Sequence, residues 1–384
     1  AVSPFFYCYN NEVYKHLTAV EGNQVSTAKE LIVGLQDRAY PLHIEYGCLA
    51  NIGKHLLQLR IANRYCIIAD ETVADLYGDI VVESLQNNNL KSELFTFPAG
   101  EASKNLSLFA ELCSRLAQKG FDRKDGIIAL GGGVTGDLAG FIAASYLRGI
   151  AFVQIPTTLL AQVDSSVGGK TGVDIPEGKN LVGAFYQPKA VYIDTSVLDT
   201  LPRDEFIGGM AEVIKYGVIR DAEFFKYLCE NRDAAIDCDK NIIEKIIYTC
   251  CKIKAEVVAK DEKEADLRRI LNYGHTIGHA VEAVSKFSII HGKAVAIGMV
   301  AAARIAVRKQ LLAKDHCESI YQILEAYDLP TEIPKEFDRN LIKKYLCTDK
   351  KIVAGKISYV LPNKIGDVVI TSDVDDSIIE EVIS

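Results

Sequence analysis

The sequence predicts an α/β domain with a largely parallel sheet, followed by a mainly α-helical domain. Short β-rich runs alternate with helical stretches between about residues 38 and 200, which indicates βαβ units. After Pro202, long helical patterns replace these runs. The chain has 384 residues, of which 49% are hydrophobic and 24% charged, so it is long and apolar enough for two compact domains.

The predicted strands are runs rich in β-branched, aromatic and other apolar residues. The run 127–130 is apolar without alternation, which is typical of a strand covered on both faces. Six strands are predicted, at residues 40–46, 65–69, 94–97, 126–130, 152–155 and 190–193. Long helices are predicted over 241–258 and 293–312, and a late hairpin over 356–361 and 366–370.

Charge and composition disfavour several classes of partner and location. The net charge is −8 and the pI about 5.5, so the surface repels nucleic acids and anionic membranes, and neither is a predicted partner. The uncharged run 294–303 is too short to span a membrane and predicts a buried helix. Ten cysteines without framework spacing, and a start that lacks a basic signal segment, predict reduced thiols in the cytoplasm, or in a plastid if the source is photosynthetic.

A glycine-rich turn follows the predicted strand 126–130. Residues 131–137 contain the pattern G-x-G-x-x-G and precede a helical stretch. Glycines let the backbone approach a pyrophosphate, whose charge is met by amides at the helix N-terminus, so the turn predicts a bound dinucleotide. A turn that serves only packing is the alternative. The glycine-rich turn is not the first βα turn of the chain, and no acidic residue ends a strand about twenty residues after it. Both features disfavour a standard Rossmann dehydrogenase.

Three of the seven histidines fall close together, at His275, His279 and His291. His275 and His279 are four residues apart, so on a helix they share one face and can bind one divalent metal. Glu212 lies among apolar residues, where an acid is rarely buried without a partner, and is the candidate carboxylate donor to zinc. Core or capping histidines, and a Glu212 that faces the surface, are the alternatives.

The segment 162–174 is polar and rich in glycine, which is typical of a segment that lines a site. The first glycine of an ATP-binding phosphate loop would fall at Asp164, so an ATPase is rejected. Cations recur in helical or loop segments, at Lys215, Lys254, Arg268, Lys350 and Lys351. If they converge, they predict a small substrate with phosphate and carboxylate groups, although each alone is more typical of a solvated surface.

Together these segments resemble 3-dehydroquinate synthase from about Leu31 to the end. The resemblance is carried by residues 98–104, 131–137, 146–149, 156–164, 169–172, 179–180, 211–215 and 271–275. It implies a Rossmann-like NAD-binding domain over 31–200 and an α-helical zinc and substrate domain over 201–384, in a homodimer. Residues 1–30 match nothing in the family pattern and are expected to form an N-terminal extension.

The resemblance also implies which residues form the site. Zinc, with cobalt as the alternative, is expected to be bound by Glu212, His275 and His291. The resemblance assigns His279 to the substrate site instead of the metal. Contacts with NAD are expected from Asp70, Glu101, Lys104, Gly132, Gly133, Val134, Thr135, Gly136, Asp137, Thr157, Thr158, Lys170, Lys179 and Thr200. Contacts with the substrate are expected from Asp164, Lys170, Asn180, Lys215, Lys254, Glu264, Arg268, Asn272, His279, either Lys350 or Lys351, and Arg148 of a neighbouring subunit.

The family converts 3-deoxy-D-arabino-heptulosonate 7-phosphate into 3-dehydroquinate and phosphate, a step of the shikimate pathway of aromatic amino acid biosynthesis. The resemblance implies transient oxidation by NAD, phosphate elimination, re-reduction and intramolecular aldol closure, with the two domains closing to exclude water. The alternatives are a sugar-phosphate cyclase of the 2-deoxy-scyllo-inosose synthase type, a metal-dependent polyol dehydrogenase, and a noncatalytic sensor on the same fold.

Overall fold

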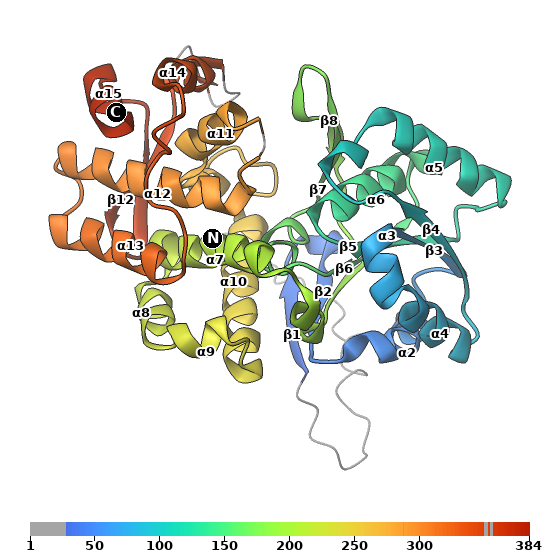
Figure 1. Cartoon of the computed structure of the whole chain (residues 1–384). Coiled ribbons are helices and arrows are strands. Elements are labelled where there is room, and N and C mark those ends of the chain that lie inside the picture. Colours follow the sequence, from blue (N-terminus) through green and yellow to red (C-terminus); the bar gives the residue numbers. More distant parts are fainter. Residues whose placement is uncertain (1–27, 287, 349–351, 354–355) are drawn as a thin grey trace, which may run out of the picture.

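The computed structural model describes residues 28–286, 288–348, 352–353 and 356–384. Figure 1 shows an α/β half beside a mainly helical half. The sheet of the first half ends with β9 (Ala190–Ile193), and the helical half begins with α7 (Arg203–Arg220). The predicted fold class, α/β followed by mainly α, is confirmed.

The α/β half is built on a seven-stranded sheet in the order β1-β2-β9-β6-β5-β3-β4. Neighbouring strands are parallel, except for the antiparallel pair β1 and β2. The other strands are β1 (Lys29–Val33), β2 (Tyr40–Ile44), β3 (Arg64–Asp70), β4 (Lys91–Phe97), β5 (Gly126–Gly131) and β6 (Ala151–Pro156). All six predicted strands are present, whereas β1 was not predicted because it is short and opens on two charged residues.

Helices cover both faces of the sheet, as the apolar strands predict. α2 (Ile52–Leu59) and α4 (Asp79–Asn87) pack on the face that contains Ile67. α5 (Leu106–Gln118) and α6 (Gly133–Ser145) pack on the opposite face of the sheet, which contains Ile68 of β3. Every residue of β5 is buried, and each fully buried branched side chain contributes roughly 1.5–3 kcal/mol to folding.

The polar, glycine-rich segment of the sequence leads into a β hairpin that was not predicted. β7 (Lys170–Ile175) and β8 (Gly178–Phe185) pair antiparallel. The two backbones approach so closely that a Cβ on Gly183 would lie 2.1 Å from the carbonyl oxygen of Thr171. Glycine is a weak strand former, which explains why the pattern did not predict these strands. In Figure 1 the hairpin projects on the side of the α/β half that faces α11 (His275–Val284).

The second half consists mainly of helices. After α7 come α8 (Ala222–Glu230), α9 (Arg232–Ile236), α10 (Lys240–Lys260), α11, α12 (His291–Arg308), α13 (Lys314–Ala326), α14 (Arg339–Thr348) and α15 (Asp376–Ile383). The two predicted helices correspond to α10 and α12, and the uncharged run 294–303 is buried within α12. The predicted late hairpin is confirmed as β12 (Tyr359–Lys364) and β13 (Asp367–Thr371), next to the short pair β10 (Ile352–Val353) and β11 (Lys356–Ile357). None of the described helices is long and apolar enough to cross a membrane.

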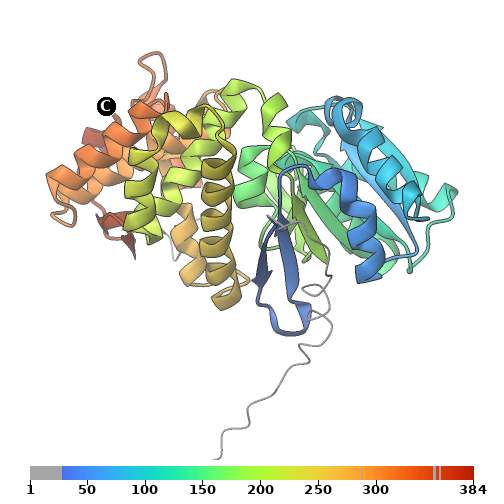
Figure 2. The same cartoon turned by 90° about the horizontal axis from the view of Figure 1, so that it is seen from below.

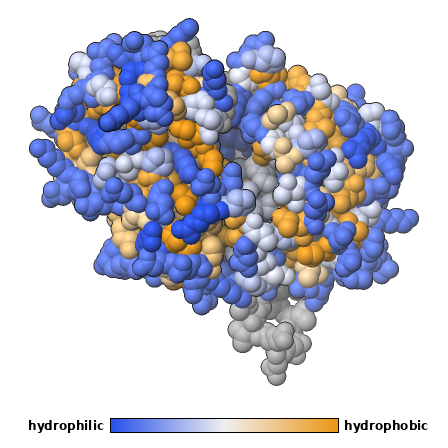
Figure 3. Space-filling model, in the orientation of Figure 1, coloured by the Kyte–Doolittle hydropathy of each residue, from blue (hydrophilic) through white to orange (hydrophobic). Residues whose placement is uncertain are grey.

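The two halves share an apolar core. Its largest cluster joins Tyr40 and Leu42 of β2 with Met210 of α7, Ile247 of α10 and Val300 of α12. Figure 2 shows the β1–β2 pair lying beside α10. The surface is hollowed between the halves in the view of Figure 3. The hydrophobic contact therefore fixes one side of the junction and leaves the other side open to a ligand.

Candidate active site

Lys170 and Lys179, two of the residues predicted to bind NAD, lie on the β7–β8 hairpin, whereas the others follow the carboxyl ends of parallel strands. They are Asp70 at the end of β3, Glu101 and Lys104 after β4, residues 132–137 after β5, Thr157 and Thr158 after β6, and Thr200 after β9. The carboxyl ends of parallel strands meet at one edge of a sheet, so the fold gathers these segments there. From β3 the chain passes to β4 on one side and then to β5 on the other. In open α/β sheets, such a change of direction marks the crevice in which ligands bind.

The glycine turn between β5 and α6 is shaped for an anion. A Cβ on Gly131 would lie 2.4 Å from Oγ1 of Thr135, and one on Gly136 would lie 2.9 Å from Oε1 of Gln154. Glycine is therefore required at Gly131 for the close approach of helix and strand, whereas the atom that faces Gly136 is the end of a flexible side chain. Gly132 is the N-cap of α6, and within the described ranges no side chain caps this end. The first amides of the helix thus remain available to bind a phosphate group.

Lys104 ties the glycine turn to the β7–β8 hairpin. Its Nζ lies 2.6 Å from Oδ2 of Asp137 in α6 and donates to Oδ1 of Asn180 in β8 at 2.6 Å. Burial alone would lower the pKa of Lys104, but the carboxylates of Asp137 and Glu101 raise it above its usual value. The Lys104 ammonium therefore remains charged and holds the two elements together.

Glu212, His275 and His291 meet in the helical half. Oε1 of Glu212 lies 3.4 Å from Nε2 of His275 and 3.8 Å from Nε2 of His291. The other carboxylate oxygen of Glu212 pairs with Lys215. Glu212 is fully buried, and its Oε1 receives no hydrogen bond from any described residue. A buried carboxylate oxygen that faces two imidazole nitrogens fits the donor set of a divalent metal.

The ring nitrogens that face away from Glu212 have their own acceptors. Nδ1 of His275 lies 3.0 Å from the carbonyl oxygen of Tyr273, and Nδ1 of His291 lies 3.1 Å from Oε2 of Glu282. Each contact favours a proton on Nδ1 and leaves Nε2 as a metal donor. His279 lies beside them, with its ring centroid 5.2 Å from that of His275 and 5.7 Å from that of His291.

Glu282 is also bound from the α/β half. Its Oε1 lies 3.2 Å from Nζ of Lys179 in β8. Burial alone would raise the pKa of the Glu282 carboxyl, but the hydrogen bond from His291 and the charges of His291 and Lys179 lower it to about 2. Glu282 is therefore a carboxylate at neutral pH.

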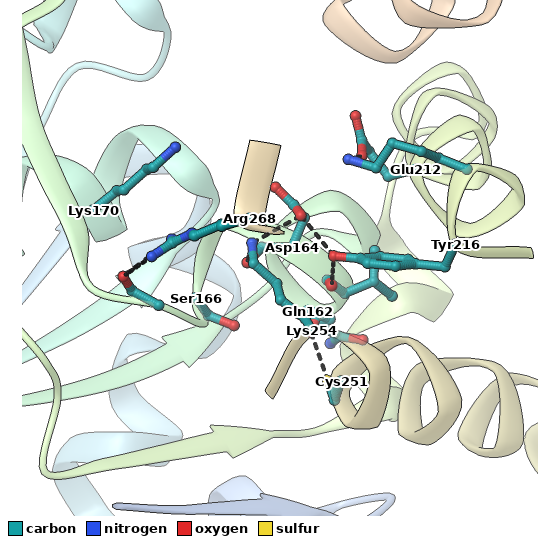
Figure 4. A network of polar contacts seen from close by, with 12 residues as sticks. Gln162, Asp164, Ser166, Lys170, Glu212, Tyr216, Cys251, Lys254 and Arg268 are labelled. Carbon is teal, nitrogen blue, oxygen red and sulfur yellow. Dashed lines mark hydrogen bonds and ion pairs between the residues drawn. The ribbon is translucent and has the colours of Figure 1, made fainter. Parts of the chain in front are cut away.

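Asp164 lies at the centre of a buried polar network, between Lys254 and Tyr216 (Figure 4). Its Oδ1 accepts hydrogen bonds from the Tyr216 hydroxyl at 2.7 Å and from Nζ of Lys254 at 2.8 Å. Burial alone would raise the pKa of Asp164, but Lys254 and Lys215 lower it well below its usual value. Burial lowers the pKa of Lys254 to about 8, with Asp164 opposing and Arg268 adding to this shift. The network thus joins two carboxylates, Asp164 and Glu212, with three cations, Lys215, Lys254 and Arg268.

Arg268 and Lys170 extend these cations toward the hairpin. Arg268 is only 2% exposed, and its guanidinium donates to the carbonyl oxygen of Gly168 at 3.1 Å. Lys170, at the start of β7, pairs with Glu264, which also accepts a hydrogen bond from Asn272. Burial alone would raise the pKa of Glu264, but Lys170, Asn272 and Arg268 lower it. The predicted substrate residues of both halves thus meet at the junction.

Other predicted residues stand apart from this arrangement. Lys350 and Lys351 lie outside the described residues, so their contact with substrate stays a prediction. Arg148 ends the short helical turn Tyr146–Arg148 after α6, and its reach into a neighbouring subunit also stays a prediction. Asn180, predicted to contact the substrate, is hydrogen-bonded to Lys104 on the side of the glycine turn.

Sequence reasoning missed two residues of the site, Glu282 and Tyr216. Glu282 follows His279 by three residues and His275 by seven, so all three share one face of α11, and this spacing was the available signal. Tyr216 directly follows Lys215 and carried no signal of its own, because its role depends on a contact with a residue 52 positions away.

Comparisons with known proteins agree with this geometry. A family model described as 3-dehydroquinate synthase N-terminal matches residues 94–208, and one described as 3-dehydroquinate synthase C-terminal matches residues 209–352. The chain is 47% identical over 353 residues to the 3-dehydroquinate synthase of Desulforamulus reducens, which covers 92% of this chain and 98% of that protein. It is 48% identical over 345 residues to that of Symbiobacterium thermophilum, with 88% and 96% covered.

Similar solved structures are more distant in sequence. A 2-deoxy-scyllo-inosose synthase with carbaglucose-6-phosphate, NAD+ and Co2+ has a TM-score of 0.85 and 30% identity, over 93% of this chain and 99% of that one. A 2-epi-5-epi-valiolone synthase from Streptomyces hygroscopicus, with NAD+ and Zn2+ bound, has a TM-score of 0.83 and 27% identity, over 94% and 98%. Because the two family models span most of the sequence and the curated relatives cover nearly all of it, the chain belongs to the 3-dehydroquinate synthase family.

Proposed function

We propose that this protein is a 3-dehydroquinate synthase, which converts 3-deoxy-D-arabino-heptulosonate 7-phosphate into 3-dehydroquinate and phosphate in the shikimate pathway. One observation carries the proposal: the metal-type donors and the buried cations form a continuous network. Glu212 pairs with Lys215, and the charge of Lys215 acts on Asp164. Asp164 in turn binds Lys254. A sugar acid phosphate, with two anionic ends and hydroxyls between them, fits such an arrangement.

Glu212, His275 and His291 would hold the metal, for which we propose zinc. The support is the buried carboxylate oxygen that faces both Nε2 atoms, and zinc accepts this mixture of oxygen and nitrogen donors. Cobalt is the alternative, since one related structure contains Co2+ and another Zn2+. The chemistry that the metal supplies when bound is Lewis acidity toward a substrate hydroxyl.

The crevice at the carboxyl edge of the sheet would hold NAD. The amides at the start of α6 suit its pyrophosphate, and the ion pair of Lys104 with Asp137 fixes the glycine turn beside it. Asp70, at the end of β3, borders the same crevice. The chemistry that NAD supplies when bound is reversible hydride transfer, which allows a transient ketone to form on the substrate.

The cations of this chain would bind and orient the anionic ends of the substrate. Lys254, with a pKa of about 8, is mostly charged at neutral pH, and the guanidinium of Arg268 lies close enough to lower that pKa. Lys170, held by Glu264, adds a third cation from the hairpin. His279 lies next to both imidazole donors, and we assign it to exchange of the proton that leaves the substrate when phosphate is eliminated.

Much of the remaining work is orientation. A pocket that holds both reacting ends of one molecule converts aldol closure into a positioned step, which can lower a barrier by roughly 7–11 kcal/mol in favourable cases. Several finer assignments belong to the same proposal: a boundary between an NAD-binding domain (31–200) and a zinc and substrate domain (201–384), a cytoplasmic homodimer, and a contribution of Arg148 to the neighbouring site.

The test of the activity supplies the heptulosonate phosphate with NAD and Zn2+ and follows phosphate and 3-dehydroquinate. Equal amounts of both products, without accumulation of NADH, are expected. Accumulation of NADH without phosphate would indicate a polyol dehydrogenase instead. Turnover of a hexose 6-phosphate with no turnover of the heptulosonate would indicate a different sugar-phosphate cyclase, and intact NAD binding without turnover a sensor.

The test of the metal site compares two histidine variants. His275→Ala removes a donor that faces Glu212 at 3.4 Å, so metal and activity are expected to be lost together. His279→Ala is expected to retain one equivalent of metal and to turn over more slowly. Metal content is measured after dialysis, beside kcat. Equal loss of metal in both variants would refute the assignment of the donors.

A further inference from the structure

Glu282 uses both of its carboxylate oxygens, and the two partners come from different halves of the molecule. Oε2 lies 3.1 Å from Nδ1 of His291, at the start of α12. Oε1 lies 3.2 Å from Nζ of Lys179, which belongs to β8 of the hairpin. The residue is only 7% exposed, so these contacts are largely shielded from water. Lys179 also pairs with Glu101 at 3.4 Å, which anchors it in the α/β half.

The two imidazole donors are held in different ways. His275 donates through Nδ1 to the backbone carbonyl oxygen of Tyr273, so its ring is fixed by the main chain two residues away. His291 relies on the side chain of Glu282. A carboxylate behind a ligating imidazole fixes the direction of the ring and increases its basicity, and both effects strengthen metal binding. The orientation of His291 therefore depends on the side chain of Glu282.

The partner of that side chain lies on the hairpin. Lys179 is the second residue of β8, and the adjacent Asn180 accepts a hydrogen bond from Lys104 beside the glycine turn. A shift of the hairpin therefore changes the distance between Lys179 and Glu282. Because the same carboxylate holds His291, the shift also reaches the donor ring.

We propose that Glu282 is a positioning residue that orients His291 for metal binding and links it, through Lys179, to the position of the β7–β8 hairpin. This inference rests on the proposed function only in requiring that His291 binds the metal. Through Lys179 and Glu282, the α/β half of the molecule contacts the proposed metal centre directly, without the substrate between them.

The experiment titrates nucleotide-free protein with Co2+, followed by its absorption bands, and measures Zn2+ affinity by competition with a chelator. Glu282→Gln has a single acceptor oxygen, which cannot satisfy His291 and Lys179 together. Its metal affinity is expected to fall about 10- to 100-fold, with altered Co2+ bands. Glu244→Gln is the matched control, since Glu244 is also a buried glutamate, at 4% exposed, in α10 and pairs with Lys29. It is expected to bind metal like the parent protein.

Lys179→Met tests the link to the hairpin. In the absence of nucleotide it is expected to weaken metal binding by less than Glu282→Gln does, and to add nothing in the double variant, because the two residues act in series. Its side chain is 31% exposed, so this variant keeps the test open if Glu282→Gln does not fold.

Any of four results would overturn the inference, in part or in whole. Parent-like metal affinity in Glu282→Gln would refute the positioning role. The proposed metal site would still stand in that case if His275→Ala lost its metal. Unchanged metal affinity in Lys179→Met, or full additivity in the double variant, would refute the link. A parent protein that binds no metal would refute both this inference and the proposed function.

Discussion

The pKa of Lys254 predicts how the catalytic efficiency depends on pH. Lys254 is 4% exposed, and burial lowers its pKa to about 8. If its positive charge binds an anionic group of the substrate, kcat/KM follows the protonated fraction of the free enzyme. That fraction falls about tenfold between pH 7 and pH 9 for a group with this pKa. We therefore expect kcat/KM to fall by about the same factor over that interval.

The assay measures phosphate release at limiting substrate between pH 6.5 and 9.5. Lys254→Arg keeps the charge throughout this range, so the alkaline fall centred near pH 8 should disappear, whatever the absolute rate. Lys252→Arg, an exposed position two residues earlier in α10, is the control and should keep the profile of the parent protein. An unchanged alkaline fall in Lys254→Arg would refute the assignment of this group.

The same pKa has a consequence for stability. The folded value of about 8 lies below the ordinary value of 10.5, so between these two pH values the unfolded chain binds more protons than the folded one. The contribution of Lys254 to the free energy of unfolding therefore rises with pH through this interval, by about 3 kcal/mol at most. Denaturant unfolding of the parent and of Lys254→Met, at pH 7.5 and pH 10, should show the difference between them change in this direction.

Two further substitutions test the glycine turn and its anchor. Gly131→Ala places a Cβ 2.4 Å from Oγ1 of Thr135, which is 1% exposed. It should weaken NAD binding and cost about 1–3 kcal/mol of stability. Gly34→Ala, with nothing within 4 Å of the added Cβ, is the control, and equal melting temperatures and NAD affinities in the two variants would contradict the prediction. Lys104→Met leaves Asp137, whose side chain is 20% exposed, without its cation and should cost about 1–3 kcal/mol in denaturant unfolding, where no measurable loss would contradict the prediction.

Much of the fold was predictable because local patterns carry it. The continuous apolar runs of β3, β5 and β6 have the length of buried strands, and the long repeats of α10 and α12 have the helical period. The β7–β8 hairpin was not predictable from such patterns. Its glycines serve close backbone contact instead of strand propensity, so only the finished packing explains them.

The site was predictable to a lesser degree, because its geometry depends on contacts between distant parts of the chain. The spacing of His275 and His279 suggested that both can reach one metal, and donor atoms of these two residues and of His291 do lie within 4.8 Å of one another. The spacing gave no sign of the carboxylate of Glu212, whose Oε1 lies 3.4 Å from His275 and 3.8 Å from His291. The return of the chain from α11 to α12 produces this arrangement, and it leaves no periodic trace in the sequence. Likewise, Lys254 and Asp164 meet across 90 residues, and neither position alone indicates the contact.

The apolar core that runs from β2 into α7, α10 and α12 has a consequence for how the gene can be divided. A fragment that stops at Leu201 would carry the nucleotide crevice but expose the β2 face, including Tyr40 and Leu42, to water. Such a fragment is expected to aggregate when expressed alone. When both pieces are expressed together, each can bury the apolar face that the other exposes. The two pieces together are therefore expected to fold and remain soluble, although neither does so alone.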